Sequence, residues 1–86
     1  MEHNHNITTI INQWNPIGIY PLVEDEYEFE IAMLINEISK HDNLFDIDHI
    51  AHMLHRIFKL QFAEDFSCSI MECRIIAIQI FACYTH

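Results

Sequence analysis

The residues that most strongly interrupt regular structure are concentrated in one short segment of this chain. The only glycine and both prolines of the 86 residues lie between Pro16 and Pro21. Gly18 is expected to have a positive φ between two extended pieces of chain, because glycine adopts that conformation without steric cost. With so little glycine and proline and 51% hydrophobic residues, the chain is excluded from the disordered, collagen-like and low-complexity classes. We therefore expect a folded chain with one fixed turn.

Length and charge narrow the class of protein further. A chain of 86 residues predicts a single domain over residues 1–86, with residues 1–5 as a flexible tail. The net charge of −9 repels phosphates and anionic lipid, so neither nucleic acid nor a membrane is an expected partner. The three cysteines form no CxxC pair, and the N-terminus has no signal-peptide pattern. We therefore expect reduced thiols and a cytoplasmic protein.

Apolar residues recur at helical spacing in four segments. These segments are residues 7–14, a stretch from 23–25 to about residue 40, residues 47–61, and the stretch that follows Ser69. Asp46 is the predicted N-cap of the third helix, and Ser69 to Glu72 match the Ser-x-x-Glu capping box of the fourth. Short links favour antiparallel neighbours. The expected fold class is all-α: three main antiparallel helices in an up-and-down arrangement plus a short N-terminal helix.

The last of these helices is apolar on two opposite sides. Its predicted core stripe comprises Cys73, Ile76, Ala77, Ile80 and Tyr84, and its other side carries Met71, Ile75, Ile78 and Ala82. A helix that is apolar nearly all round is normally central or shared with a partner. We expect Ile75 and Ile78 to form a joint patch with Phe29 and Met33 that mediates a homodimer or a protein contact. In the alternative arrangement, the N-terminal helix folds back over Ile75 and Ile78.

Three groups of residues are candidates for chemistry. His49, His52 and His55 suggest a metal site, but they fan over about 120° of a helix that also carries Arg56 and Lys59, so a solvated face is favoured. Acidic residues gather where the second helix is expected to begin: Glu24, Asp25, Glu26, Glu28 and Glu30. They are interpreted as a complement to the helix dipole, in preference to a partner-recognition surface and, least of all, a carboxylate catalytic site. Cys68 lies just before the fourth helix, where a dipole can lower a thiol pKa, but the sequence assigns it no catalytic partner.

Trp14 and Tyr27 are interpreted as core residues in preference to a ligand platform, because each belongs to an apolar helical stripe. We expect Trp14 to be largely buried between the N-terminal helix and the helices that begin at Tyr27 and Ser69. It would thereby lock the loop from Pro16 to Pro21.

A sequence motif surrounds these two aromatic residues. The run from Trp14 to Ile19, Trp-Asn-Pro-Ile-Gly-Ile, is followed by Asp-Glu-Tyr at residues 25–27. This pattern resembles the YugE-like domain family of small uncharacterised bacterial proteins, and similar motifs occur in some toxin-immunity proteins. The resemblance implies a small helical domain and no enzyme. It assigns structural roles to the motif residues Trp14, Pro16, Gly18, Asp25, Glu26 and Tyr27.

Together these observations predict a small acidic cytosolic binding or regulatory protein, in one version an immunity-type inhibitor of a basic partner. It is not expected to be an enzyme, nor to hold a cofactor, a metal or a catalytic residue. The alternative is a metal-binding protein or enzyme that uses the face of His49, His52 and His55. The predicted partner-binding residues are Glu26, Phe29, Glu30, Met33, Ile75 and Ile78.

Overall fold

The computed structural model describes residues 2–23, 25–40 and 46–84, with side chains from residue 6 onward. Within these residues, four α-helices and one short 3₁₀ helix follow one another. They are α1 (Glu2–Trp14), α2 (Glu28–Lys40), α3 (Ile47–Phe62), η1 (Ala63–Asp65) and α4 (Ile70–Tyr84). The residues described contain no strand. The predicted all-α class is therefore confirmed.

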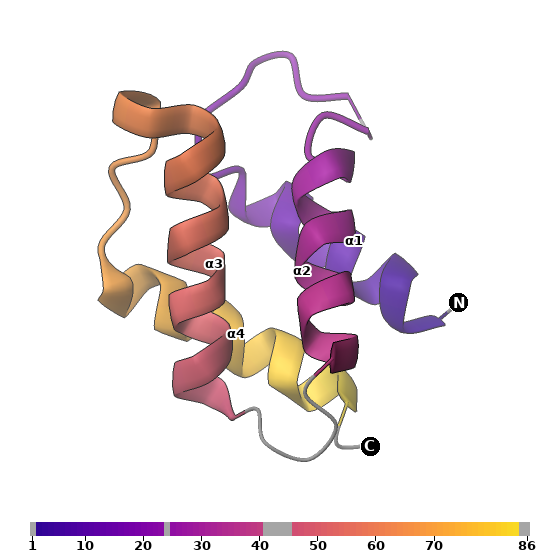
Figure 1. Cartoon of the computed structure of the whole chain (residues 1–86). Coiled ribbons are helices and arrows are strands. Elements are labelled where there is room, and N and C mark those ends of the chain that lie inside the picture. The colour runs from indigo at the N-terminus through magenta and orange to yellow at the C-terminus, as the bar shows by residue number, and fades with distance from the viewer. Residues whose placement is uncertain (1, 24, 41–45, 85–86) are drawn as a thin grey trace.

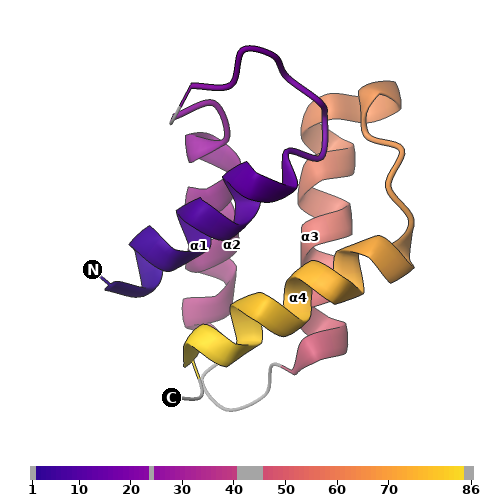
Figure 2. The same ribbon diagram turned by 180° about the vertical axis from the view of Figure 1, so that it is seen from behind.

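The helices form two layers, as Figures 1 and 2 show from opposite sides. In Figure 1, α2 and α3 stand side by side in front and run in opposite directions, while α1 and α4 pass behind them. The helix α4 packs against α3 and α1, and within the described part of the chain it makes no contact with α2. The helix α1 is as long as α2 and begins at Glu2. The backbone of residues 2–5, expected to be a flexible tail, is therefore part of this helix.

The core lies between the two layers, and every α-helix contributes to it. The buried apolar side chains are Ile7, Ile11, Tyr27, Ile31, Leu34, Ile38, Ile50, Ala51, Met53, Leu54, Ile57, Phe58, Phe66, Cys73, Ile76, Ala77 and Ile80. The first four members of the core stripe predicted for the last helix are buried, and Tyr84 is partly buried. None of the described helices is both long enough and apolar enough to cross a membrane.

The two predicted helix caps are present. The Asp46 side chain accepts a hydrogen bond of 2.9 Å from the backbone N–H of His49. In the capping box, the Ser69 N–H donates to Glu72 Oε1 at 2.9 Å, and the Glu72 N–H donates to Ser69 Oγ at 3.2 Å. These bonds satisfy backbone donors that the first turn of a helix leaves free.

The start of α2 differs from the sequence prediction. The helix begins at Glu28, because residues 25–27 form a separate turn in which the N–H of Glu28 donates to the carbonyl of Asp25 at 3.2 Å. Asp25 and Glu26 therefore precede the helix. Glu24 and the predicted break at residues 41–45 lie outside the described residues.

Candidate functional site

The loop after α1 is organised by hydrogen bonds around Asn15. This residue has a φ of 45°, and its N–H donates to the carbonyl of Ile11 at 2.9 Å, which ends the helix. Its side-chain Nδ2 donates to the Ile19 carbonyl at 3.0 Å, and its Oδ1 accepts the Ile19 N–H at 3.1 Å. Gly18 has a φ of 72°, as predicted from the sequence. One asparagine side chain thus holds the turn closed.

Tyr27 anchors this turn to the core. Its side chain is fully buried, and its hydroxyl donates to Asn15 Oδ1 at 2.5 Å and accepts the N–H of Ile17 at 3.2 Å. Its ring meets Phe58 and Phe62 edge to face, at centroid distances of 5.7 and 6.1 Å. Burial raises the pKa of the Tyr27 hydroxyl, and the hydrogen bond from Ile17 partly opposes that rise. The motif is therefore a structural lock on the loop.

Asn15 was not among the residues predicted to organise this loop. The signal was available, because an asparagine directly after the last helical residue is typical of a C-terminal cap with positive φ. The motif residue Pro16 adds a weaker link, since its carbonyl lies 3.9 Å from Cys68 Sγ.

Trp14 packs against a different part of the molecule from the one predicted. Its ring meets Phe58 and Phe66 edge to face, at centroid distances of 5.7 and 6.2 Å, and its side chain is partly buried. We expected contacts with α2 and α4, but α1 ends beside α3 and the segment that precedes α4. Phe66 is itself buried and stacks on Phe58 at 5.7 Å. Trp14 therefore covers an aromatic cluster centred on α3.

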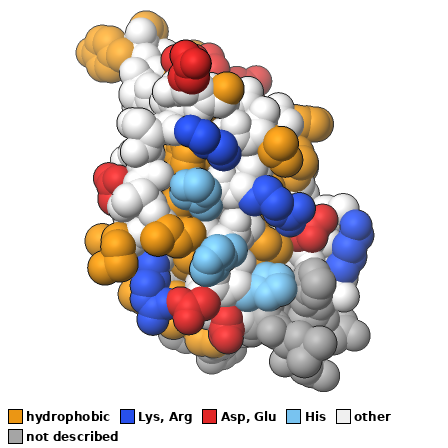
Figure 3. Space-filling model, turned by 60° about the vertical axis from the view of Figure 1, so that its left-hand side comes forward, with side chains coloured by type: hydrophobic (Ala, Val, Ile, Leu, Met, Phe, Trp, Pro, Cys, Tyr) orange, Lys and Arg blue, Asp and Glu red, His pale blue; other side chains and the backbone are white. Residues whose placement is uncertain are grey.

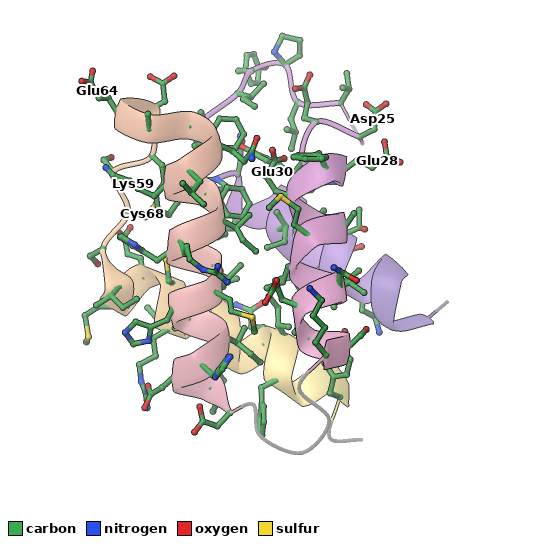
Figure 4. All side chains as sticks on the ribbon, in the orientation of Figure 1. Asp25, Glu28, Glu30, Lys59, Glu64 and Cys68 are labelled. Atoms are coloured by element: carbon green, nitrogen blue, oxygen red, sulfur yellow. The ribbon has the colours of Figure 1, made fainter. Side chains whose placement is uncertain are left out.

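Glu30 is buried, which corrects its predicted place on a partner-binding surface. It is only 6% exposed, and its Oε1 has no hydrogen-bond partner in the described part of the chain. It lies three residues after Tyr27 and so shares the core-facing side of α2. Figure 4 shows Glu30 directed toward α3, with Asp25 and Glu28 on the far side of α2. Burial raises the pKa of the Glu30 carboxyl.

We predict that Glu30→Gln stabilises the protein by about 1 kcal/mol at pH 7, because a buried carboxylate with one unpaired oxygen is costly and a neutral amide is less so. A carboxyl pKa that is raised on folding contributes stability at low pH, which is lost as the pH rises through the folded-state value. The advantage of the variant should therefore shrink as the pH falls toward 4. Urea unfolding at several pH values measures this. An equal advantage at every pH would contradict the assignment.

The remaining predicted partner-binding residues fall on two separate surfaces. Phe29 is 61% exposed on α2, and Met33 is partly buried beside Gln61 of α3, whose Nε2 lies 3.9 Å from its sulfur. Ile75 and Ile78 lie on α4, which does not contact α2 among the residues described. The joint patch expected from the sequence is therefore not formed, because α2 and α4 are not neighbours in the described part of the chain. Glu26 is exposed in the turn before α2.

The outer side of α4 carries an uncovered apolar row that we call the α4 stripe, made of Met71, Ile75, Ile78 and Ala82. The first three of these side chains are 68%, 60% and 49% exposed. The helix α1 does pack on α4, but Ile75 and Ile78 remain exposed beside it. The fold-back alternative is therefore realised only in part: the contact exists without covering these two residues.

The three histidines of α3 line an open hollow on the surface. This histidine hollow has a volume of about 490 Å³ and is lined by His49, His52, Met53, His55 and Arg56. His55 also packs edge to face on Phe66, at a centroid distance of 5.6 Å. Within the described ranges, no three His, Cys, Asp or Glu side chains are placed to hold a metal ion.

The cysteine thiols are free, and two of them are less acidic than ordinary thiols. Burial raises the pKa of Cys73 to about 12, and burial together with the nearby Glu72 raises the pKa of Cys68. The helix dipole therefore does not activate Cys68, in contrast to the sequence-based possibility. Figure 4 labels its position in the segment between η1 and α4.

These features define a class of protein: a small all-α domain whose notable surfaces are an apolar stripe and a hollow lined by three histidines, one arginine and one methionine. The chain belongs to the family described as a domain of unknown function (DUF1871). The model of this family matches residues 6–85. No curated protein and no solved structure matches it. The expected membership of an uncharacterised domain family is confirmed. The comparisons support neither the name YugE-like nor the link to toxin immunity.

Proposed function

We propose that this domain is a small cytosolic binding or regulatory protein that acts without catalysis, through the α4 stripe. The observation that carries the proposal is the exposure of Met71, Ile75 and Ile78 on one side of a helix whose opposite side is core. Burying each of the two isoleucines against a partner would contribute about 1.5 to 3 kcal/mol. The raised pKa values of the Cys68 and Cys73 thiols disfavour a nucleophilic role for these two residues.

The occupant that suits this surface best is a second copy of the chain. Successive members of the stripe are four, three and four residues apart. This spacing is the same whether it is followed from the N-terminal or the C-terminal end of the helix. Two antiparallel copies of α4 would place Ile75 of one against Ile78 of the other, and Met71 against Ala82. A twofold symmetric contact requires such a self-complementary surface.

The charges beside the stripe suit a contact between two acidic molecules. Glu72 is held in the capping box of its own helix, and Arg74 forms an ion pair with Asp48 of α3. The charge of Arg74 is thus paired within one chain, and the Glu72 carboxylate is fixed by the backbone of its own helix. A molecule of net charge −9 would repel its copy across most of its surface, but less so at this apolar row.

Sedimentation velocity at high micromolar concentration tests the proposal. We expect the wild type to be a dimer and the double variant Ile75→Glu with Ile78→Glu to be a folded monomer, because two charges would be buried unpaired in the contact. The matched control is Phe29→Glu with Leu60→Glu, which introduces the same charges at side chains that are 61% and 70% exposed on other helices. This control should stay dimeric. A monomeric wild type, or equal dissociation of both double variants, would contradict the proposed dimer.

The immunity-type version of this function is a finer proposal, in which the acidic surface inhibits a basic protein. It is supported by the net charge and by Asp25 and Glu28, which line a hollow of about 210 Å³ with Thr8 and Ile31. Its discriminating observation is genomic: a gene for a basic toxin next to this one would favour it.

A further inference from the structure

The fixed positive charge of this acidic chain gathers on and around α3. The sequence has only four Lys and Arg residues. Arg56 and Lys59 belong to α3, and Arg74 of α4 forms an ion pair with Asp48 of α3. Lys40 and Arg56 both pair with Glu37 of α2, at 3.8 and 3.7 Å. Figure 3 shows the blue side chains arranged around the pale blue histidines.

The histidine hollow lies within this ring of positive charge. Arg56 is one of its lining residues, and its side chain is 58% exposed. An exposed ion pair of this kind is weak, so Glu37 leaves guanidinium donors available for another anion. Met53 is buried and supplies an apolar surface to the hollow.

One histidine of the hollow has a defined hydrogen-bond role. His52 Nδ1 lies 2.8 Å from the carbonyl oxygen of Asp48. A carbonyl oxygen only accepts, so Nδ1 carries the hydrogen in this contact, and Nε2 donates only when the ring is protonated. Binding of an anion by Nε2 therefore requires the charged imidazolium.

We propose that the histidine hollow binds a small dianionic oxyanion, such as phosphate or a phosphate ester, in a proton-coupled manner. Arg56 supplies the fixed charge, and His49 and His52 add charge on protonation. Three described acidic groups are bonded to residues of the hollow or its surroundings: Glu37 of α2, Asp48 of α3 and the N-cap residue Asp46. Glu37 and Asp48 are paired with basic side chains, and Asp46 accepts the N–H of His49. The guanidinium in the lining also disfavours a metal cation at the same place.

Sulfate is the probe for the proton coupling, because it keeps its double charge across the pH range used. We would titrate it into ¹⁵N-labelled wild-type protein at pH 7.5 and pH 6.0 and follow the histidine resonances by NMR, with sodium chloride at matched ionic strength as the reference. Imidazoles gain protons over this range, so the Kd should fall about five-fold or more at the lower pH. Binding that is independent of pH, or shifts that do not saturate, would overturn the proposal.

Two charge-neutralising variants separate a built site from diffuse attraction. Arg56→Gln removes a lining residue, and Lys59→Gln removes the same charge from the same helix outside the lining. Both side chains are exposed, and circular dichroism checks that both variants fold. We expect Arg56→Gln to weaken sulfate binding about five-fold or more, because this variant loses direct bonds to the anion. Lys59→Gln should weaken it about two-fold or less, because this variant loses only a screened charge. Equal losses would show diffuse attraction only and overturn the proposal.

Inorganic phosphate and phenyl phosphate then distinguish the two sources of the oxyanion. Tighter binding of phenyl phosphate identifies an ester whose apolar group contacts Met53, and equal binding identifies the free oxyanion; either result supports the site. The hollow is lined by residues of α3 alone. These binding measurements therefore test the site independently of the oligomeric state proposed for α4.

Discussion

Replacing Trp14 with alanine is expected to lower the free energy of unfolding by about 3 kcal/mol, at the lower end of the range for large aromatic truncations. The side chain is only partly buried, but its ring makes edge contacts with both Phe58 and Phe66. Removing it would expose the aromatic cluster that joins α1 to α3. A domain of this size has roughly 5 kcal/mol of stability in total, so the variant would be close to unfolding at room temperature. Urea melts followed by far-ultraviolet circular dichroism measure the loss.

Tyr20→Ala is the matched control for this prediction. Tyr20 belongs to the same loop, but its side chain is 94% exposed. Its removal should change the free energy of unfolding by no more than about 0.5 kcal/mol. A similar small loss for Trp14→Ala would mean that the contacts with Phe58 and Phe66 do not stabilise the fold.

The helices could be predicted because their signals are local. Asp46 and Ser69 cap the third and fourth helices as expected, and the apolar spacing identified the buried sides of both. The prediction was less accurate at α2, where the acidic residues suggested an earlier start. The separate turn at residues 25–27 depends on Tyr27, whose hydroxyl is held by a loop ten to twelve residues away. Such a contact has no local periodicity to reveal it.

The candidate surfaces were predicted only in part, because helical periodicity does not encode which helices become neighbours. The apolar pattern within each helix correctly predicted that Phe29 and Ile75 are exposed. A joint patch of the two would also have required contact between α2 and α4, which the described residues do not make. Glu30 was misplaced for a related reason. Its place among the acidic residues at the expected start of the second helix suggested an exposed side chain. The helix is instead oriented by the buried Tyr27, three residues earlier, so Glu30 is turned inward.

Tyr27→Phe is expected to lower the free energy of unfolding by about 2 kcal/mol, although the aromatic ring and its packing are kept. The loss comes from the hydroxyl, which donates to Asn15 Oδ1 and accepts from the Ile17 N–H. Both partners are part-buried, and a polar group left unpaired away from water costs about 1 to 3 kcal/mol. Chemical denaturation of wild type and variant at neutral pH measures the difference.

A double-mutant cycle with Asn15→Ala isolates the bond between the two side chains. Asn15→Ala also removes the two bonds to Ile19, so its own cost includes the loosening of the turn. If the Asn15–Tyr27 bond is the link that ties the loop to the core, the double variant should lose less than the sum of the single losses, by about 1 kcal/mol. Strictly additive losses would show that the two residues stabilise the loop independently. The motif would then be two neighbouring features of the loop, with no energetic coupling between them.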